Sequence, residues 1–305
     1  MSELQKQNAS LKRINAPSDD PSGSAKLMTI RNDSIDNSQF EKNSNLAKTF
    51  LNYTDSSLED VTNILVRAKE LALGQASAAA NGPSSRLMVA EEINNLMNEL
   101  SSVANRRLGD RYIFSGYKTN QQPFDEKGRY AGDDGKIMVE VQKDVFVGMN
   151  LPGREVFLGA NQVDPTAPNG VRGLEEGANA VSPELAIKQS AERPNDDAFR
   201  TLESLRISLM TNDIDGIRAT LDPLDKIRDR VITARAQVGS RVQGIDTAIN
   251  NMARNNVFNA ELQSSIEDTD LIQVVSDMAK EETVLRASLQ ASNKMIQPTL
   301  LDFLK

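Results

Sequence analysis

In two long stretches of this chain, mostly apolar residues recur at alternating intervals of four and three, which places them on one face of a helix. The first stretch carries this face at Ala47, Leu51, Thr54, Leu58, Val61, Leu65, Ala68 and Ala72. The second carries it at Ile217, Thr220, Leu224, Ile227, Val231, Ala234, Val238, Arg241, Ile245, Ala248 and Met252. This spacing keeps one stripe of a helix against a partner helix. The chain is therefore expected to consist mainly of long helices packed side by side.

The breaks between these helices come from proline and glycine. A helix over residues 36–80 should stop at 81–83 (NGP), and Ser84 or Ser85 could cap the next helix. The stripe of that next helix is Ala90, Ile93, Met97, Leu100 and Ala104. A short connection predicts an antiparallel helix hairpin. Pro223 marks either a kink or the true start of the second long helix.

The last 35 residues form a third apolar seam. It comprises Leu271, Val275, Met278, Leu285, Leu289 and Ile296, and the chain then ends with Leu300, Leu301, Phe303 and Leu304. Hydroxyl and acidic residues over 264–270 suit the start of this helix. Because free chain ends are usually polar and frayed, we expect the apolar face of this helix to bind another chain. The alternative is a core helix packed on its own domain.

The middle of the chain has the alternation typical of strands. Short strands are predicted at residues 111–114, at the alternating Ile137, Val139 and Val141, and at residues 145–147 and 155–157. Residues 158–194 are rich in Gly, Pro, Asn and Ala and predict loops.

The pattern as a whole predicts a mainly α protein with a β-rich insert. The expected fold is an elongated antiparallel helical bundle whose N- and C-terminal segments form a terminal coiled coil. A connector with two prolines, Pro17 and Pro21, should separate coil from bundle. The expected domains are a terminal coil and connector (1–31 with 267–305), a helical rod (32–110 with 195–266) and a β-rich outer insert (111–194).

Composition excludes several classes of function. A net charge of −8 argues against binding a nucleic-acid backbone. The sequence contains no run of about 18 apolar residues, so we expect no membrane span, and it does not open with a cleavable signal. Taken alone, these two features suggest a cytoplasmic protein. The chain has no His and no Cys, which removes the usual catalytic bases, thiol nucleophiles and metal ligands. We therefore expect no enzyme activity, no metal and no cofactor.

Several stretches resemble the flagellin superfamily of bacterial flagella. Residues 13–21 (RINAPSDDP) resemble the family's connector between coil and rod, 66–72 (VRAKELA) its bundle helix, and 266–270 (IEDTD) the entry to its C-terminal helix. Within the superfamily, residues 105–117 (NRRLGDRYIFSGY), followed by Pro123 and Phe124, and the tail 290–304 are similar to the hook–filament junction family more than to flagellin. The resemblance covers residues 10–125 and 196–305 well and the insert poorly.

The resemblance implies a structural role and a set of partners. The implied partners are other copies of the chain in a ring, the hook-side junction protein, flagellin, and a cytoplasmic export chaperone that covers the C-terminal helix. It also implies that the seam residues and the apolar tail form the assembly interface. Export through the flagellar type III channel without a cleaved signal would place the protein outside the cell, in the flagellum.

Two other functions stay open at this stage. The chain could be flagellin itself, the filament subunit, or a hydrolase carried in the β-rich insert. The N-terminal coil helix is also shorter than the family's, from which we expect a truncated start.

Three charged groups have two interpretations each. The helix surface around Arg67, Lys69 and Glu70 resembles one that an innate immune receptor recognises in flagellin, or is a solvated bundle face. The acidic residues of 267–270 could bind calcium but lack the EF-hand spacing, so a charge cluster at a helix start is expected instead. Arg106, Arg107 and Arg111 could bind anions, and we expect salt bridges.

Overall fold

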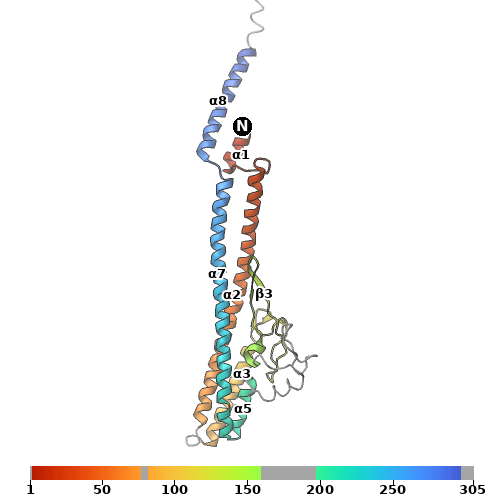
Figure 1. Ribbon diagram of the computed structural model, residues 1–305, viewed down its shortest axis with the longest axis vertical. Coiled ribbons are helices and arrows are strands. Elements are labelled where there is room, and N and C mark those ends of the chain that lie inside the picture. The colour runs from red at the N-terminus through yellow and green to blue at the C-terminus, as the bar shows by residue number, and fades with distance from the viewer. Residues whose placement is uncertain (1, 77–81, 159–196, 297–305) are drawn as a thin grey trace, which may run out of the picture. The chain divides into compact units, whose positions relative to one another are not determined.

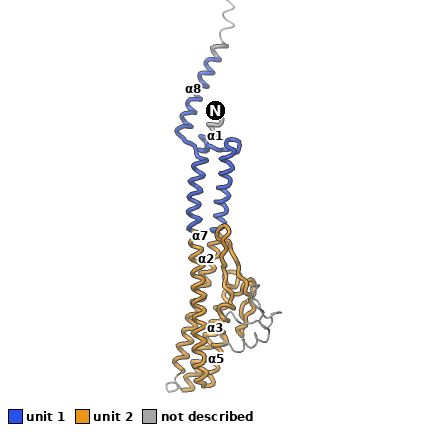
Figure 2. The backbone as a smooth tube through the Cα atoms, viewed as in Figure 1, with its two compact units in different colours: residues 1–41, 250–305 blue, residues 42–249 orange. Residues whose placement is uncertain are grey.

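The computed structural model describes residues 2–76, 82–158 and 197–296, with side chains described from residue 6 and up to residue 292. Its helices are α1 (Ser2–Ser10), α2 (Pro21–Gln75), α3 (Pro83–Ala104), α5 (Ala198–Met210), α6 (Ile214–Ala219), α7 (Leu221–Glu267) and α8 (Leu271–Ile296), as Figure 1 shows. Its strands are β1 (Arg107–Leu108), β2 (Arg111–Tyr112), β3 (Met138–Gln142) and β4 (Val145–Gly148), and a π-helical turn η1 spans Arg154–Leu158. The chain divides into a smaller unit, residues 1–41 with 250–305, and a larger unit, residues 42–249 (Figure 2).

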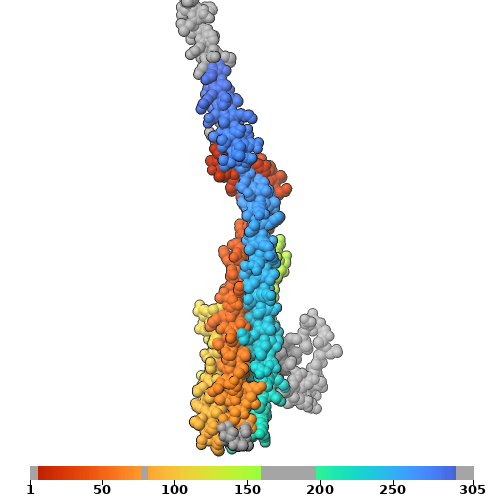
Figure 3. All heavy atoms as spheres, turned by 90° about the vertical axis from the view of Figure 1, so that its left-hand side faces the viewer, coloured from red at the N-terminus to blue at the C-terminus, as the bar shows by residue number. Residues whose placement is uncertain are grey.

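The core of the larger unit is the predicted heptad seam. All eight predicted positions of α2 are at most 1% exposed, from Ala47 to Ala72. The α7 positions facing them are buried as well, except Arg241, which donates to the carbonyls of Gly148 and Asn150 at 3.3 and 3.1 Å. On the face drawn in Figure 3, the atoms of α2, α3 and α7 of this unit lie directly against one another. Periodicity therefore predicted the α2 and α7 side chains of this core, which also contains residues of α3, α5 and η1.

The ends of the helices differ from the expected positions. Helix α2 begins at Pro21, well before residue 36, and the Asp20 carboxylate accepts from the Gly23 amide at 2.9 Å. Helix α3 has Gly82 as its N-cap and no side-chain cap, so the predicted caps Ser84 and Ser85 are wrong. The reason is Pro83, whose fixed φ suits the first helical position and starts the helix there.

Helix α7 begins at Leu221, so Pro223 lies in its first turn and marks the true helix start. Helix α5, which comes before α6, is capped by Asp197, whose carboxylate accepts from the amides of Phe199 and Arg200.

Two antiparallel hairpins form the β structure of the larger unit. Strand β1 pairs with β2, and β3 pairs with β4 with an irregularity between Glu140 and Gln142. The strand expected over 111–114 ends at Tyr112, because Ile113 and Phe114 turn into the core. The strand expected over 155–157 is wrong, since these residues belong to η1. The loops expected over 158–194 lie, apart from Leu158, outside the described residues. The predicted fold class, a mainly α protein with a β-rich insert, is confirmed.

A cluster of aromatic rings fills the interior between the hairpins and α5. Its members are Phe114, Phe124, Tyr130, Phe157 and Phe199, with neighbouring ring centroids 5.1–6.1 Å apart. Nearby, Gly116 has φ +70°, and a Cβ there would lie 2.2 Å from the Asp133 carbonyl oxygen. This close approach requires a glycine, which explains part of the distinctive 105–124 stretch.

The smaller unit joins the two ends of the chain. It holds α1, the first turns of α2, the last turns of α7, and α8. Helix α1 lies against α8, and the connector after α1 pairs with the end of α7 through the bridge between Lys12 and Asp268. The connector itself bends over residues 12–20, as the two prolines predicted.

Candidate assembly interface

Helix α8 exposes most of its predicted seam. Leu271, Val275, Leu285 and Leu289 are 47–57% exposed, and Met278 is half-buried. The other predicted interface residues are Ile296, Leu300, Leu301, Phe303 and Leu304, whose side chains lie outside the described part. A helix that leaves its apolar side chains in water is a candidate docking surface for another chain.

Helix α1 covers one side of α8. The Asn8 amide approaches the Met278 sulfur at 3.8 Å, and Val274 is 5% exposed. Val274 is the one buried residue in the described part of α8, and sequence reasoning missed it. A second heptad reading, through Leu271, Val274 and Met278, has the same spacing and could have identified it.

The start of α8 is fixed by its own cap and by the end of α7. The Asp270 carboxylate accepts from the amides of Ile272 and Gln273 at 2.9 and 3.3 Å, which satisfies two of the free donors of the first turn. The Thr269 amide donates to the Leu11 carbonyl, and the Arg13 amide donates to the Glu267 carbonyl at 2.6 Å. The connectors at the two ends of the chain therefore hold each other through backbone hydrogen bonds.

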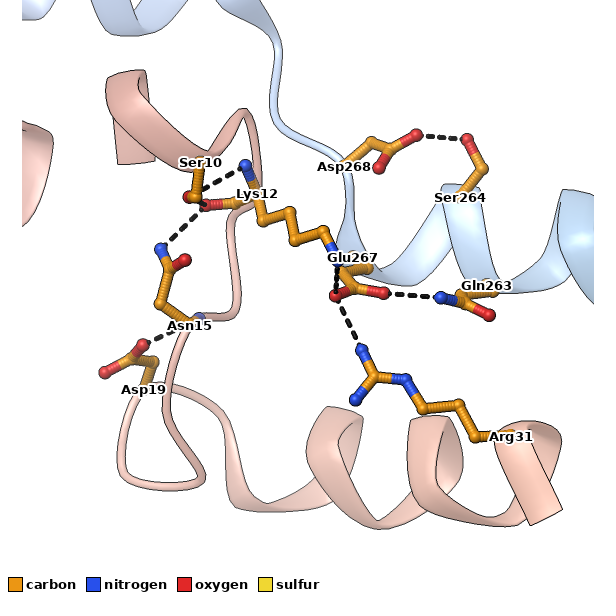
Figure 4. Close-up of polar contacts among 9 residues, drawn as sticks. All are labelled: Ser10, Lys12, Asn15, Asp19, Arg31, Gln263, Ser264, Glu267 and Asp268. Carbon is orange, nitrogen blue, oxygen red and sulfur yellow. Dashed lines mark hydrogen bonds and ion pairs between the residues drawn. The ribbon is translucent and has the colours of Figure 1, made fainter. Parts of the chain in front are cut away.

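A buried carboxylate lies at the centre of this joint. The side chain of Glu267 is 3% exposed, and its Oε1 contacts Lys12 Nζ at 2.6 Å and Arg31 Nη2 at 2.7 Å. Its Oε2 accepts from Gln263 Nε2 at 2.8 Å (Figure 4). We call Lys12, Arg31, Gln263 and Glu267 the clamp. It ties the N-terminal connector and α2 to the last turn of α7.

The clamp keeps Glu267 ionised. Burial alone would raise the pKa of this carboxyl, but hydrogen bonds from Lys12, Gln263 and Arg31 outweigh it and lower the pKa from 4.5 to about 2. Around the same connector, the Asp19 carboxylate accepts from the amides of Ala16 and Asn15, which lowers the pKa of Asp19. The joint thus depends on charge-assisted hydrogen bonds.

The expected role of the acidic cluster is correct for Asp270 and wrong for Glu267. Asp270 caps the start of α8, whereas Glu267 is the last residue of α7 and pairs with cations. Its two partners are 236 or more residues away in sequence, so no local pattern reveals the pairing. Among the described residues, no group of three acidic, His or Cys side chains is placed to hold a metal ion.

The other charged candidates form ion pairs within the bundle. Arg67 pairs with Glu92 at 2.7 Å, and Lys69 pairs with Asp225 at 2.6 Å. Arg106 pairs with Asp60, as expected, whereas Arg107 lies over the Tyr112 ring at 4.9 Å and donates to the Asp110 carbonyl. These contacts favour a structural role for these cations.

Two shifted titratable groups in the larger unit also have structural roles. Burial raises the pKa of Tyr130, whose hydroxyl donates to the carbonyls of Phe114 and Asp133. Burial also raises the pKa of Asp197, the N-cap of α5. Shifted pKa values mark candidate active sites, but both side chains are bound to backbone: Tyr130 donates to two carbonyls, and Asp197 accepts from two amides as a helix cap.

Comparison with known proteins agrees with this architecture. Residues 1–119 match the family model described as the bacterial flagellin N-terminal helical region. A solved flagellar hook-associated protein from Vibrio parahaemolyticus has the same fold, with a TM-score of 0.66 at 18% identity over 82% of this chain and all of that chain. The solved flagellar junction protein from Legionella pneumophila has a TM-score of 0.58 at 18% identity, covering 81% of this chain and all of that chain. No helix in the described part is long and apolar enough to cross a bilayer.

The family match over residues 1–119 and the shared fold make the chain similar to structural proteins of the flagellin superfamily. Flagellar hook-associated protein 3 of Escherichia coli is 27% identical over 294 residues, which cover 93% of this chain and 86% of that protein. Flagellin of Listeria innocua is 22% identical over 295 residues, 95% of this chain and 86% of that protein. The chain is thus more similar to hook-associated protein 3 than to this flagellin, as the 105–124 stretch and the tail predicted.

Proposed function

We propose that this flagellar protein forms the junction between the hook-side assembly and the flagellin filament, with α8 as its assembly interface. The observation that carries the proposal is the exposed apolar seam of α8 on a base fixed by the clamp. The similarity to hook-associated protein 3 supports the same role. No chemistry is required for it, because the function is to bind two different neighbours at once.

In this proposal the seam packs against neighbouring copies in a ring. The contact residues are Leu271, Val275, Met278, Leu285, Leu289, Ile296, Leu300, Leu301, Phe303 and Leu304. At about 25 cal/mol per Å² of apolar surface, burying several of these side chains contributes roughly 10 kcal/mol before ordering costs are subtracted. The hook-side junction protein lies on one side of the ring and flagellin on the other.

The three-part division gives each part of the chain a task. The terminal part, 1–31 with 267–305, makes the inner contacts of the ring, and the rod, 32–110 with 195–266, spaces neighbouring copies. The insert, 111–194, lies outermost. The position of the exposed apolar seam on α8 and the flagellin-like fold support this arrangement.

The same seam requires cover before assembly. An exposed apolar helix in the cytoplasm invites aggregation, so we place an export chaperone on α8 until the chain leaves the cell. Export through the flagellar type III channel without a cleaved signal then delivers it to the extracellular flagellum. The absence of cysteine suits a chain that passes unfolded through a channel and needs no disulfide outside.

Complementation in two non-motile strains of the source bacterium tests the function. One strain lacks its own copy of this gene and sheds flagellin into the medium, and the other lacks flagellin. We expect the chain to restore motility to the first strain alone. A matched variant lacking residues 271–305 should fail to restore it, and normal incorporation of that variant into flagella would contradict the role of α8.

The second candidate is flagellin itself, favoured by the full-length match to the Listeria flagellin. Rescue of only the strain that lacks flagellin would establish that role instead. The hydrolase alternative gains no support from the described part of the insert, where burial raises the pKa of Tyr130 and its hydroxyl is bound to backbone carbonyls.

A further inference from the structure

Helix α8 is joined to α7 by a short break in the helix. Helix α7 ends at Glu267 and α8 begins at Leu271, so residues 268–270 lie between them, outside either helix. Each residue of such a linker has two adjustable backbone torsion angles. The direction of α8 is therefore not set by a continuous helix and depends on contacts made across the break.

Packing contributes little to fixing that direction. Among the described side chains of α8, only Val274 is buried, and the Asn8 amide approaches the Met278 sulfur at 3.8 Å. These contacts belong to the side of α8 that faces α1. Helix α1 is itself separated from α2 by the bent connector of residues 12–20. The α1–α8 pair is therefore held to the rest of the smaller unit mainly where the two connectors meet.

The carboxylate of Glu267 lies at that meeting point, directly before the break. It contacts Lys12 of the N-terminal connector at 2.6 Å and Arg31 of α2 at 2.7 Å (Figure 4). Lys12 also lies opposite Asp268, the first residue of the break, in the antiparallel bridge. One side chain thus links α7, the connector and α2. Because it is only 3% exposed, Glu267 is not available for contact with a neighbouring molecule.

The backbone at the joint has a conformation that contacts must impose. Leu11, directly after α1, has φ +55°, in the left-handed region. This region is unfavourable for leucine and persists only where the surrounding structure fixes it. The Leu11 carbonyl accepts from the amide of Thr269, in the middle of the break. The joint therefore holds one particular backbone geometry.

We propose that Glu267 is a positioning residue for assembly: through Lys12 and Arg31 it fixes the direction in which α8 leaves the smaller unit and so aims the apolar seam at its partner. The inference rests on the proposed role of α8 as the assembly interface. Identical copies in a closed ring must present the same surface in the same direction. A helix whose direction is already fixed also loses less conformational freedom on binding. Loss of the clamp should therefore weaken assembly although the seam itself is unchanged.

Binding to isolated hooks tests this role. Hooks are prepared from the strain that lacks its own copy of the gene and sheds its flagellin. They are mixed with purified chain and sedimented, and the bound chain is measured by immunoblot. Glu267→Gln keeps the size of the side chain and removes its charge. We expect this variant to keep its helix content by circular dichroism and to bind at least about fivefold less than the unmodified chain.

A disulfide in place of the clamp separates positioning from every other role of the carboxylate. Lys12 and Asp268 lie opposite each other in the bridge, with backbone hydrogen bonds between the two connectors on both sides. Opposite residues of this kind have Cα atoms about 4.5 Å apart, within the range that a disulfide spans. Lys12→Cys and Asp268→Cys are therefore added to Glu267→Gln, in a chain that has no cysteine of its own. We expect this triple variant to regain hook binding when oxidised and to lose it when reduced.

Asp246→Asn is the matched control, because Asp246 is also a paired carboxylate of α7 but lies in the larger unit, 2.5 Å from Lys48. It should bind hooks like the unmodified chain. Normal binding of Glu267→Gln, an equal loss in Asp246→Asn, or no recovery in the oxidised triple variant would each overturn the positioning role and leave the junction role intact. If the unmodified chain does not bind hooks, the junction role fails and the positioning role fails with it.

Discussion

At the residue scale, one carboxylate holds three segments of the smaller unit together. Glu267 accepts from Lys12 and Arg31, which come from the N-terminal connector and α2, and from Gln263 on its own helix. Its pKa of about 2 lies below the ordinary value of 4.5. The ionised carboxylate of Glu267 is therefore more stable in the folded protein than in the unfolded chain. This contribution is fully present above about pH 4.5 and is lost as the pH falls towards 2.

Glu267→Gln should weaken the clamp in a pH-dependent way. The shift in the pKa of Glu267 corresponds to a stabilisation of the folded protein by at most about 3 kcal/mol. Because Lys12 and Arg31 are partly exposed to solvent, the expected contribution is roughly 1–3 kcal/mol. We expect faster hydrogen exchange at the Arg13 amide at pH 7, by about 5- to 100-fold, with a difference that shrinks between pH 4.5 and 2. Glu261→Gln, an exposed position on the same helix, is the control and should change little. A difference that stays constant with pH would contradict the account of the clamp.

At the element scale, α2 and α8 carry similar apolar seams with opposite exposure. Leu58 of α2 is 0% exposed, whereas Leu289 of α8 is 57% exposed. The same leucine-to-alanine change should therefore have different effects in the two helices. In α2 it leaves a cavity, and in α8 it removes surface that only a partner covers.

Leu58→Ala should lower the free energy of unfolding by about 2–5 kcal/mol, measured by urea denaturation of the purified chain. Leu289→Ala should change it by less than about 0.5 kcal/mol, yet reduce the amount of chain found in isolated flagella by immunoblot. Thr283→Ala, on the same helix away from the seam, provides the control for incorporation. Normal incorporation of Leu289→Ala would contradict the role of α8 as the interface. A large loss of stability in this variant would show that the seam of α8 is already covered within the chain.

Elements that repeat a period could be predicted from sequence, and those fixed by single local contacts could not. The buried faces of α2 and α7 follow from four-three spacing, because each position repeats the same contact. The start of α3 depends instead on Pro83 at one position, and the turn at 154–158 on how Val156 and Phe157 enter the aromatic cluster. Alternation over so few residues cannot separate a strand from a π-helical turn.

The candidate site was predictable to a similar extent. The heptad seam identified the exposed apolar face of α8 but not Val274, because two overlapping registers fit the same helix. The clamp could not be predicted, since Lys12 and Arg31 meet Glu267 only after the two ends of the chain fold together.

At the scale of the whole molecule, both chain ends contribute to one unit and the middle of the chain to another. The smaller unit holds the exposed apolar face of α8, and the larger unit has a continuous apolar core. This division suits a protein whose larger unit folds by itself and whose smaller unit is completed by neighbours. We therefore expect the chain to occur at one place in the flagellum, where two kinds of neighbour meet.

Immunogold electron microscopy of isolated flagella, with an antibody against the chain, tests this requirement most directly. We expect gold confined to a single short zone where the hook meets the filament, and none on the hooks isolated from the strain that lacks the gene and sheds its flagellin. Gold distributed along the filament would contradict the junction role and identify the chain as a filament subunit.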